Sequence, residues 1–180
     1  MKYNPDKHHR RSIRLNGYDY TLPGAYFITL CVYQRECLFG EIVNGKMQLN
    51  ELGQIVTDAY LWLETQYPYV NLDAWVVMPN HLHGIVVLTD NPRRGGSRTA
   101  PTENPTKRKP LGRLIGAFKT VSTKQINLLR DRSGVPLWQR DYYDRIIRDE
   151  EAFHTIRQYI QDNPLRWEQD QLHPDNPSNW

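Results

Sequence analysis

Short runs of apolar, aromatic and β-branched residues alternate with polar breaks along the chain. Such runs are typical of strands, and we expect strands at residues 25–34, 46–49, 73–78, 82–88 and 136–143. The pair Asn44-Gly45 predicts a tight turn before the second run, and Pro79-Asn80 separates the third run from the fourth. These runs predict one largely antiparallel sheet.

Three longer segments carry apolar residues at helical spacing. Residues 51–66 follow Asn50, which is a suitable N-cap, and residues 111–130 form a second amphipathic segment. Residues 149–163 open with three acidic residues and end before Pro164. The order β-β-α-β-β-α-β-α contains the β-α-β-β-α-β arrangement of ferredoxin-like folds. We therefore expect a single α+β domain with helices packed against the sheet.

The chain of 180 residues is long enough for one domain, and 39% of its residues are apolar, which is enough to build a core. We expect that domain at residues 21–167, after a basic N-terminal arm at 1–20. Residues 90–110 are rich in Pro, Gly, Arg, Ser and Thr and predict a flexible loop. Residues 168–180 form a polar tail whose composition is typical of disorder.

The distribution of charge is more informative than the net charge of +3. Residues 1–14 carry a local charge of +4, and residues 90–113 carry +5. Clustered positive charge suits a polyanion, because each neutralised phosphate releases counterions. Charge alone leaves open the alternative that these segments are simply solvated.

Several classes of protein are excluded by what the sequence contains. Two cysteines, Cys31 and Cys37, cannot build a disulfide framework or a zinc ribbon. No apolar stretch approaches the ~18 residues of a membrane span, and the first residues lack the apolar region of a signal peptide. We therefore expect a soluble cytoplasmic protein in a reducing compartment, with no membrane partner.

The first candidate for chemistry is the pair His81 and His83. Side chains two positions apart on a strand point to the same face, so the imidazoles converge while Leu82 faces the core. Two neutral imidazoles on one face are a workable pair of metal ligands. The alternative is that the His-x-His pattern is structural or incidental.

The second candidate is the pair Tyr159 and Asn163 in the last predicted helix. These residues are four positions apart, so the phenol and the amide share one flank beside the apolar stripe. A free tyrosine has a pKa of about 10 and needs a cation or a base to act as a nucleophile at neutral pH. The alternative is a tyrosine at the rim that packs its ring on the sheet.

Together these segments resemble a known family. Residues 78–86 (MPNHLHGIV) resemble the HUH motif of single-tyrosine transposases, and residues 158–166 (QYIQDNPLR) resemble the Tyr-Ile-x-x-Asn-Pro signature of REP-associated tyrosine transposases. Residues 137–143 (LWQRDYY) and 24–29 (GAYFIT) resemble the Trp-Gln strand and the opening strand of that family. The segments occur in the family order and span residues 24–166.

The resemblance implies a mechanism for this chain. His81, His83 and Asn163 would hold Mg²⁺ or Mn²⁺, and Tyr159 would attack a phosphodiester of single-stranded DNA. A 5′-phosphotyrosine link and a free 3′-hydroxyl would result, and reversal of the step by a 3′-hydroxyl would rejoin strands. The implied substrate is hairpin DNA of palindromic repeats, with no small-molecule substrate. Hairpin binding without cleavage, and RNA-hairpin binding, are the alternatives.

Further residues are expected to contact the DNA or the core. The resemblance favours a monomer and leaves a homodimer open. Trp138 is expected in the core, and Tyr142 and Tyr143 on opposite strand faces, which leaves one of the two for stacking on a base. Basic residues expected to bind DNA are Arg10, Arg11, Arg14, Arg93, Arg94, Lys107, Arg108, Lys109, Lys119, Lys124 and Arg140.

Overall fold

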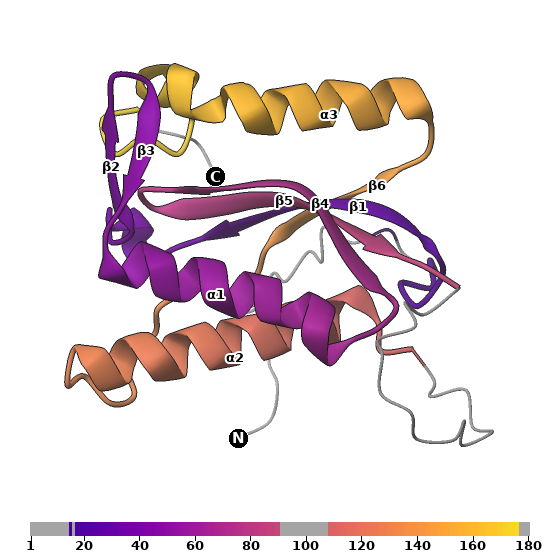
Figure 1. Cartoon of the computed structure of the whole chain (residues 1–180), viewed down its shortest axis with the longest axis horizontal. Coiled ribbons are helices and arrows are strands. Elements are labelled where there is room, and N and C mark those ends of the chain that lie inside the picture. The colour runs from indigo at the N-terminus through magenta and orange to yellow at the C-terminus, as the bar shows by residue number, and fades with distance from the viewer. Residues whose placement is uncertain (1–14, 16, 91–107, 177–180) are drawn as a thin grey trace, which may run out of the picture.

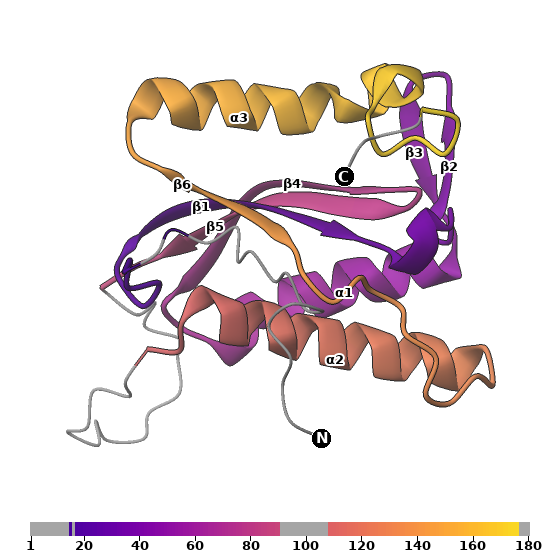
Figure 2. The ribbon, with the colours of Figure 1, turned by 180° about the vertical axis from the view of Figure 1, so that it is seen from behind.

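The computed structural model describes residues 15, 17–90 and 108–176 and has the expected α+β architecture (Figure 1). A central sheet is covered by α1 and α2 on one face and by α3 on the other (Figures 1 and 2). The helices and strands, in chain order, are β1 (Gly24–Cys31), β2 (Gly40–Val43), β3 (Lys46–Leu49), α1 (Glu51–Gln66), β4 (Val70–Met78), β5 (His81–Leu88), α2 (Leu111–Leu129), β6 (Tyr143–Ile147) and α3 (Glu150–Asp162). Two short 3₁₀ helices, η1 (Tyr33–Arg35) and η2 (Asn163–Gln169), complete the described elements.

The main sheet has the strand order β4-β5-β1-β6 and is antiparallel throughout, as expected. In its register, Cys31 at the end of β1 faces His81 at the start of β5. Strands β2 and β3 form a separate hairpin. The Asn44-Gly45 turn is confirmed, with φ angles of 51° and 70° that match a hairpin turn.

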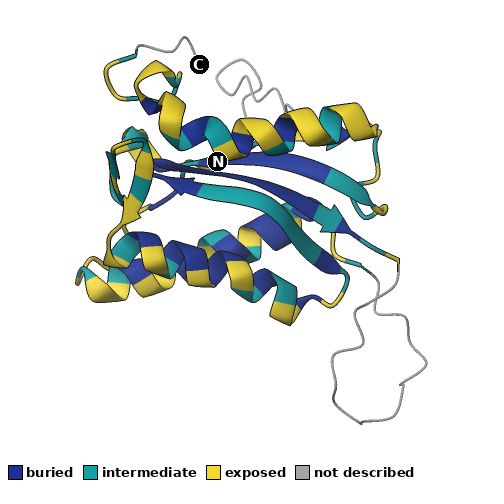
Figure 3. Cartoon of the chain, turned by 45° about the horizontal axis from the view of Figure 1, so that its top comes forward, coloured by how far each residue is buried: buried dark blue, intermediate teal, exposed yellow. Residues whose placement is uncertain are grey.

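Strand alternation divides the core into two clusters, one on each face of the sheet (Figure 3). The larger cluster lies between the sheet and α1 with α2 and includes Tyr60, Leu82 and Phe118. The smaller cluster lies under α3 and includes Ile85 and Ile160. Because Leu82 packs in the larger cluster, the residues on either side of it in β5 face α3.

The predicted helix boundaries agree closely with the structure. The Asn50 side chain accepts a hydrogen bond from the Gly53 N–H at 3.0 Å and caps α1. The Asp149 carboxylate caps α3 by accepting from the Ala152 N–H at 2.7 Å. Helix α3 is tied to β4 by Arg157, whose guanidinium donates two hydrogen bonds of 2.8 Å to the Asp73 carboxylate. These contacts determine where the side chains of α3 meet the sheet.

The strand expected at residues 136–143 is wrong, because β6 begins only at Tyr143. Within 136–142 the structure has one isolated bridge, between Val32 and Trp138. Trp138 is buried there as expected, and its indole N–H donates to Ser122 Oγ at 2.9 Å. The Lys119 ammonium donates to the carbonyls of residues 139 and 141, which a neighbouring strand would otherwise use.

The first expected strand also ends earlier than predicted, at Cys31. Gln34 and Arg35 adopt left-handed φ angles of 57° and 58°, which end the extended conformation and form η1. Strand β2 was not among the expected runs. Its four residues pair with β3 and contain a charged residue, Glu41, which weakens the hydrophobic signal.

Residues 170–176 fold back onto the start of β5, although the composition of the tail is typical of disorder. The Asn80 amide donates to the Leu172 carbonyl at 2.7 Å, and the ring of His173 packs edge-on against Trp167 at 4.7 Å. The Asn176 amide donates to the carbonyls of Glu168 and Asp170. This segment therefore lies beside the candidate histidines. In the part of the chain that the structure describes, no helix has the length and apolar character needed to cross a membrane.

Candidate active site

His81 and His83 lie side by side at the start of β5, on the face that α3 covers. Their ring centroids are 4.5 Å apart, and the two side chains are almost fully buried. The Nδ1–H of His81 donates to Asn80 Oδ1 at 2.8 Å, and Nδ1 of His83 pairs with Thr29 Oγ1 at 2.8 Å. With both Nδ1 atoms held in this way, both Nε2 atoms face one shared space. A partner on the second nitrogen is the usual arrangement for histidines that bind metal ions.

A third candidate ligand is Asp170, just beyond η2. One ligand atom from each of His81, His83 and Asp170 lies within 4.8 Å of the others. The Asp170 side chain is 6% exposed, and its Oδ2 lies 3.8 Å from His81 Nε2. Its other oxygen accepts from the Leu172 N–H at 2.7 Å, which fixes the orientation of the carboxylate.

Buried polar atoms without hydrogen-bond partners around this space indicate whether the residues fit a metal ion. Among the described residues, His81 Nε2 and Asn163 Oδ1 are buried and have no hydrogen-bond partner. Leaving such an atom without a partner costs about 1–3 kcal/mol. A divalent cation between the imidazoles and the oxygens would satisfy these atoms. The structure brings Asn163, at the start of η2, next to His81, and the donor types present fit a divalent ion.

Burial keeps both imidazoles neutral, which is the form that binds metal ions. Burial lowers the pKa of His81 to about 3, although the Asn163 side chain opposes that shift. Burial also lowers the pKa of His83 well below its usual range, and the neighbouring His81 adds to the effect. At neutral pH, protons therefore compete only weakly with a metal ion for the imidazole nitrogens of His81 and His83.

Tyr159 extends from α3 toward the histidines. Its hydroxyl oxygen lies 3.2 Å from His83 Nε2, and its ring packs edge-on against Phe27 at 6.0 Å. Tyr159 is 42% exposed, so part of the residue meets solvent. Burial and the Asp170 charge raise the pKa of Tyr159 to about 12, while a hydrogen bond from Asn163 lowers it. The tyrosine thus packs its ring on the sheet and holds its hydroxyl beside a candidate ligand.

A cleft of about 660 Å³ opens over this group of side chains. One wall is formed by residues of the sheet and α3, including Thr29, His83 and Tyr159. Two cations also line the cleft: Arg35, which lies in η1, and Arg166, which lies in η2. Arg35 was missed by the sequence analysis, because a single arginine between two predicted strands carries no pattern.

Tyr142 and Tyr143 take opposite faces, as the alternation predicted. Tyr142 packs against the larger core cluster, with the Lys119 ammonium 5.7 Å from its ring centroid. Tyr143 packs against the smaller cluster, with its ring 6.1 Å from Phe27. Both residues line the cleft.

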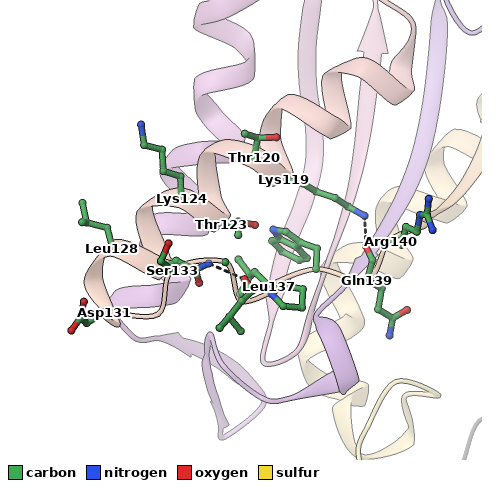
Figure 4. A pocket seen from close by; sticks show the side chains of 15 residues that line it. Lys119, Thr120, Thr123, Lys124, Leu128, Asp131, Ser133, Leu137, Gln139 and Arg140 are labelled. Carbon is green, nitrogen blue, oxygen red and sulfur yellow. Dashed lines mark hydrogen bonds between the residues drawn. The ribbon is translucent and has the colours of Figure 1, made fainter. Parts of the chain in front are cut away.

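The structure separates the basic residues predicted to bind DNA into groups. Arg108 donates to Asp90 and to the Thr89 carbonyl, and the Lys109 ammonium lies 5.2 Å from the Tyr67 ring centroid. Both therefore lie near the Leu88 end of β5, away from the histidines. A second group lines another pocket, beside the C-terminal half of α2, and consists of Lys119, Lys124 and Arg140 (Figure 4). The predictions that fall outside the described residues are Arg10, Arg11, Arg14, Arg93, Arg94 and Lys107.

No family model matches the chain. A Haemophilus influenzae protein described as an uncharacterized protein is 43% identical over 182 residues, which cover 97% of this chain and 98% of that relative. The solved structure of a REP-associated tyrosine transposase bound to a REP hairpin is similar with a TM-score of 0.59 and 19% identity, and the match covers 88% of this chain and 76% of that one. The chain therefore belongs to the same family as the Haemophilus influenzae protein and has the fold of a REP-associated tyrosine transposase.

Proposed function

We propose that this protein is a metal-dependent DNA strand transferase that cleaves and rejoins single-stranded hairpin DNA through Tyr159. The observation that carries the proposal is the 3.2 Å distance between the Tyr159 hydroxyl and His83 Nε2, within one buried cluster of metal-ligand type. A nucleophile this close to a metal ligand is suited to attack on a phosphate held at the same ion. The fold likeness supports the same reaction class.

His81 and His83 would hold a Mg²⁺ or Mn²⁺ ion through their Nε2 atoms, and Asp170 and Asn163 offer oxygen ligands. Carboxylate and amide oxygens favour these hard cations over a closed zinc site. When bound, the ion would polarise the scissile phosphate and stabilise charge on the leaving oxygen. Asn80 and Thr29 hold the two imidazoles in orientation through their Nδ1 atoms.

Tyr159 would supply the nucleophilic oxygen. Its hydroxyl would lose a proton to solvent, and its oxygen would form a bond to phosphorus while the bond from phosphorus to the 3′-oxygen breaks. The leaving 3′-oxygen would take up a proton from solvent. The products are a 5′-phosphotyrosine and a free 3′-hydroxyl, and the reverse reaction with a 3′-hydroxyl rejoins the strands. The raised pKa of Tyr159, about 12, means that the phenol needs activation when substrate binds.

Single-stranded hairpin DNA is the proposed partner, with no small-molecule or membrane partner. Exposed Lys124 and Arg140 offer positive charge, and Tyr142 and Tyr143 offer rings beside the cleft. Stacking of one base on such a ring contributes about 1–3 kcal/mol. The solved transposase of similar fold is itself bound to a REP hairpin, which supports this choice.

A second candidate is hairpin binding without productive cleavage. It is favoured by the contact of the Tyr159 hydroxyl with His83 Nε2, the atom that a metal ion would need. A protein that kept this contact in the complex would bind DNA and leave it intact.

Covalent capture distinguishes the two candidates. The chain is incubated with hairpin DNA from the host genome and Mn²⁺ and is then run on a denaturing gel. We expect a protein–DNA adduct that is absent with EDTA and absent in Tyr159→Phe. Tyr143→Phe is the matched control, since it removes a second hydroxyl from the same cleft and should leave the adduct intact.

An adduct that persists in Tyr159→Phe would contradict the assignment of the nucleophile. Tight hairpin binding by the wild type with no adduct would favour the second candidate. Equal binding of a DNA hairpin and an RNA hairpin, again with no adduct, would point to recognition without preference for DNA.

A further inference from the structure

The turn after β1 places an arginine in the active-site cleft. Gln34 and Arg35 both have left-handed φ angles, of 57° and 58°, in η1. Residues other than glycine rarely adopt this conformation, and two consecutive cases persist only where the surrounding structure holds them. Strained backbone of this kind is concentrated at functional sites, so the turn indicates a position where the direction of a side chain matters.

Contacts with neighbouring segments hold this turn in place. The Tyr33 N–H donates to the Leu137 carbonyl at 2.8 Å. The Asn80 amide donates to the Arg35 carbonyl at 3.2 Å, and the oxygen of the same side chain accepts from His81 Nδ1 at 2.8 Å. One side chain therefore holds both the backbone of the arginine and the imidazole of a candidate metal ligand.

The Arg35 side chain lies close to the candidate metal site. It lines the cleft together with Cys31, which pairs with His81 across β1 and β5. Burial raises the pKa of the Cys31 thiol to about 11, and the positive charge of Arg35 opposes this shift more than any other charge does. Because the effect of a charge falls with distance, the guanidinium lies near the thiol. The cation is thus beside the strand residue that faces His81.

Arg35 forms no ion pair with any residue that the structure describes. Arg166, the other arginine of the cleft, lies 3.7 Å from an Asp162 carboxylate oxygen, and its side chain is 67% exposed. Arg35 differs in being half-buried and without a carboxylate partner. A guanidinium binds phosphate oxygens through short, charge-assisted hydrogen bonds, which are strongest where water is partly excluded. Of the two arginines, Arg35 is therefore the better placed to bind a phosphate in the cleft.

We propose that Arg35 is a catalytic residue that binds a non-bridging oxygen of the scissile phosphate and stabilises the negative charge of the transition state. The inference rests on the proposed function and adds a group to its active site. While the bond from the Tyr159 oxygen to phosphorus forms and the bond from phosphorus to the 3′-oxygen breaks, the guanidinium donates hydrogen bonds and keeps its protons. Arg35 is not a metal ligand, so its loss leaves metal affinity unchanged.

Single-turnover cleavage of hairpin DNA in the presence of Mn²⁺ tests this role. Arg35→Asn removes the guanidinium and introduces a residue that tolerates a left-handed backbone. We expect the rate of adduct formation to fall about 100-fold or more, the usual effect of losing one group that stabilises the transition state. Hairpin affinity in EDTA, measured by fluorescence anisotropy, and Mn²⁺ affinity, measured by calorimetry, should stay close to those of the wild type.

A methylphosphonate at the scissile position distinguishes an electrostatic role from a structural one. The wild-type adduct locates that position, and the methyl group replaces one oxygen, so that the scissile group carries no charge. The ratio of the wild-type rate to the Arg35→Asn rate should then fall from about 100 to below about 10, because there is less charge to stabilise. Arg35→Lys keeps the positive charge and should recover part of the rate on the natural phosphodiester.

Gln34→Asn is the matched control. It introduces the same residue at the neighbouring left-handed position, and Gln34 is not among the residues that line the cleft. We expect this variant to form the adduct at the wild-type rate. Its hairpin affinity and Mn²⁺ affinity should also match those of the wild type.

An unchanged rate in Arg35→Asn would overturn the role of Arg35 and leave the Tyr159 adduct, and so the proposed function, in place. A rate ratio that is the same for the phosphodiester and the methylphosphonate would overturn it too. An equal loss in Gln34→Asn would do the same, since the shape of the turn would then be the cause. If the wild type forms no adduct, the proposed function and the role of Arg35 fail together.

Discussion

One side chain, that of Asn80 directly before β5, connects the candidate metal site to residues near the end of the described chain. The Asn80 carboxamide accepts from His81 with its oxygen and donates to the Leu172 carbonyl with its nitrogen. Asp170, two residues before Leu172, directs an oxygen at the same imidazole. The position of the carboxylate ligand and the orientation of the histidine therefore depend on one side chain.

Substitution at Asn80 separates these two roles. Asn80→Ala removes the hydrogen bonds to His81, to the Leu172 carbonyl and to the Arg35 carbonyl. It should weaken Mn²⁺ binding about 10–100-fold, the usual effect of losing a group that orients a ligand. Asn80→Asp keeps the acceptor for His81 and loses the donor to the Leu172 and Arg35 carbonyls, so it should retain more affinity than Asn80→Ala. Isothermal titration calorimetry with Mn²⁺ measures the metal affinity of each variant. Equal losses in the two variants would show that the contact with His81 is not the one that matters.

The role of Asp170 as a candidate third metal ligand is tested by Asp170→Asn. The change keeps the shape of the side chain and removes its charge, and we expect Mn²⁺ affinity to fall at least about tenfold. Electron paramagnetic resonance of bound Mn²⁺ follows the change without any DNA. Asn163→Ala is the comparison, because Asn163 offers a neutral oxygen in the same space. Undiminished affinity in Asp170→Asn, with a loss in Asn163→Ala, would leave the ligand set of the sequence analysis in place.

The histidine pair was predictable because strand alternation acts locally, and both rings share a face as expected. Tyr159 and Asn163 were predictable as neighbours because four residues make about one helical turn. Asp170 was not predictable. It lies in a polar segment without periodicity, and it reaches the site only because Asn80 and Trp167 hold that segment back against the fold.

At the scale of elements, caps and apolar stripes located the helices, whereas one strand was misplaced. The apolar residues Leu137 and Trp138 resemble a strand but serve the core beneath α2, where Trp138 pairs with Ser122. The actual strand β6 contains Asp144, a buried acidic residue that breaks the expected pattern. The alternation of apolar and polar residues alone cannot distinguish a hydrogen-bonded strand from a loop that buries some of its apolar side chains.

The bidentate pair between Arg157 and Asp73 fixes α3, and with it Tyr159, on β4. Arg157 holds the pKa of Asp73 below its usual range. A depressed pKa in the folded state adds stability above the unfolded pKa of about 3.9, and that stability is lost as pH falls through the folded value. Asp73→Asn should therefore lower Tm at pH 7 and have a shrinking effect below about pH 4.

The shift in Tm should be small, because both side chains are partly exposed and salt screens the pair. Thermal unfolding at several pH values and two salt concentrations measures it. The matched control is Asp58→Asn, an exposed acidic residue on α1 that is bonded only to Gln54 among the described residues. A Tm difference for Asp73→Asn that stays constant from pH 7 to pH 3 would exclude the ion pair as its cause.

At the scale of the whole molecule, the sheet separates the candidate metal site from the cations beside α2. Helix α3 covers the face that holds the histidines, and α1 and α2 cover the opposite face (Figure 2). Lys124 lies on α2, and Arg140 lines the same pocket. Clustered charge was visible in the sequence, but its distribution between the ends of the molecule was not. Arg108 contacts the Thr89 carbonyl, just beyond the end of β5 opposite His81, and β5 itself spans roughly 24 Å at ~3.4 Å per residue.

The candidate site is also complete within one chain, which supports a monomer as the working unit. The Tyr159 hydroxyl contacts His83 of the same chain, and the Arg157–Asp73 pair holds α3 on its own sheet. Two inactive variants, Tyr159→Phe and His83→Ala, provide the test when they are mixed in equal amounts. A site assembled in cis yields no DNA adduct from the mixture, whereas exchange of helices between two chains would restore it. Light scattering of the wild type in the absence of DNA should give a mass near 21.3 kDa, both with and without Mn²⁺. Hairpin binding by each variant alone shows that both are folded, so that an absent adduct reports on the site and recovery of the adduct would refute the monomer.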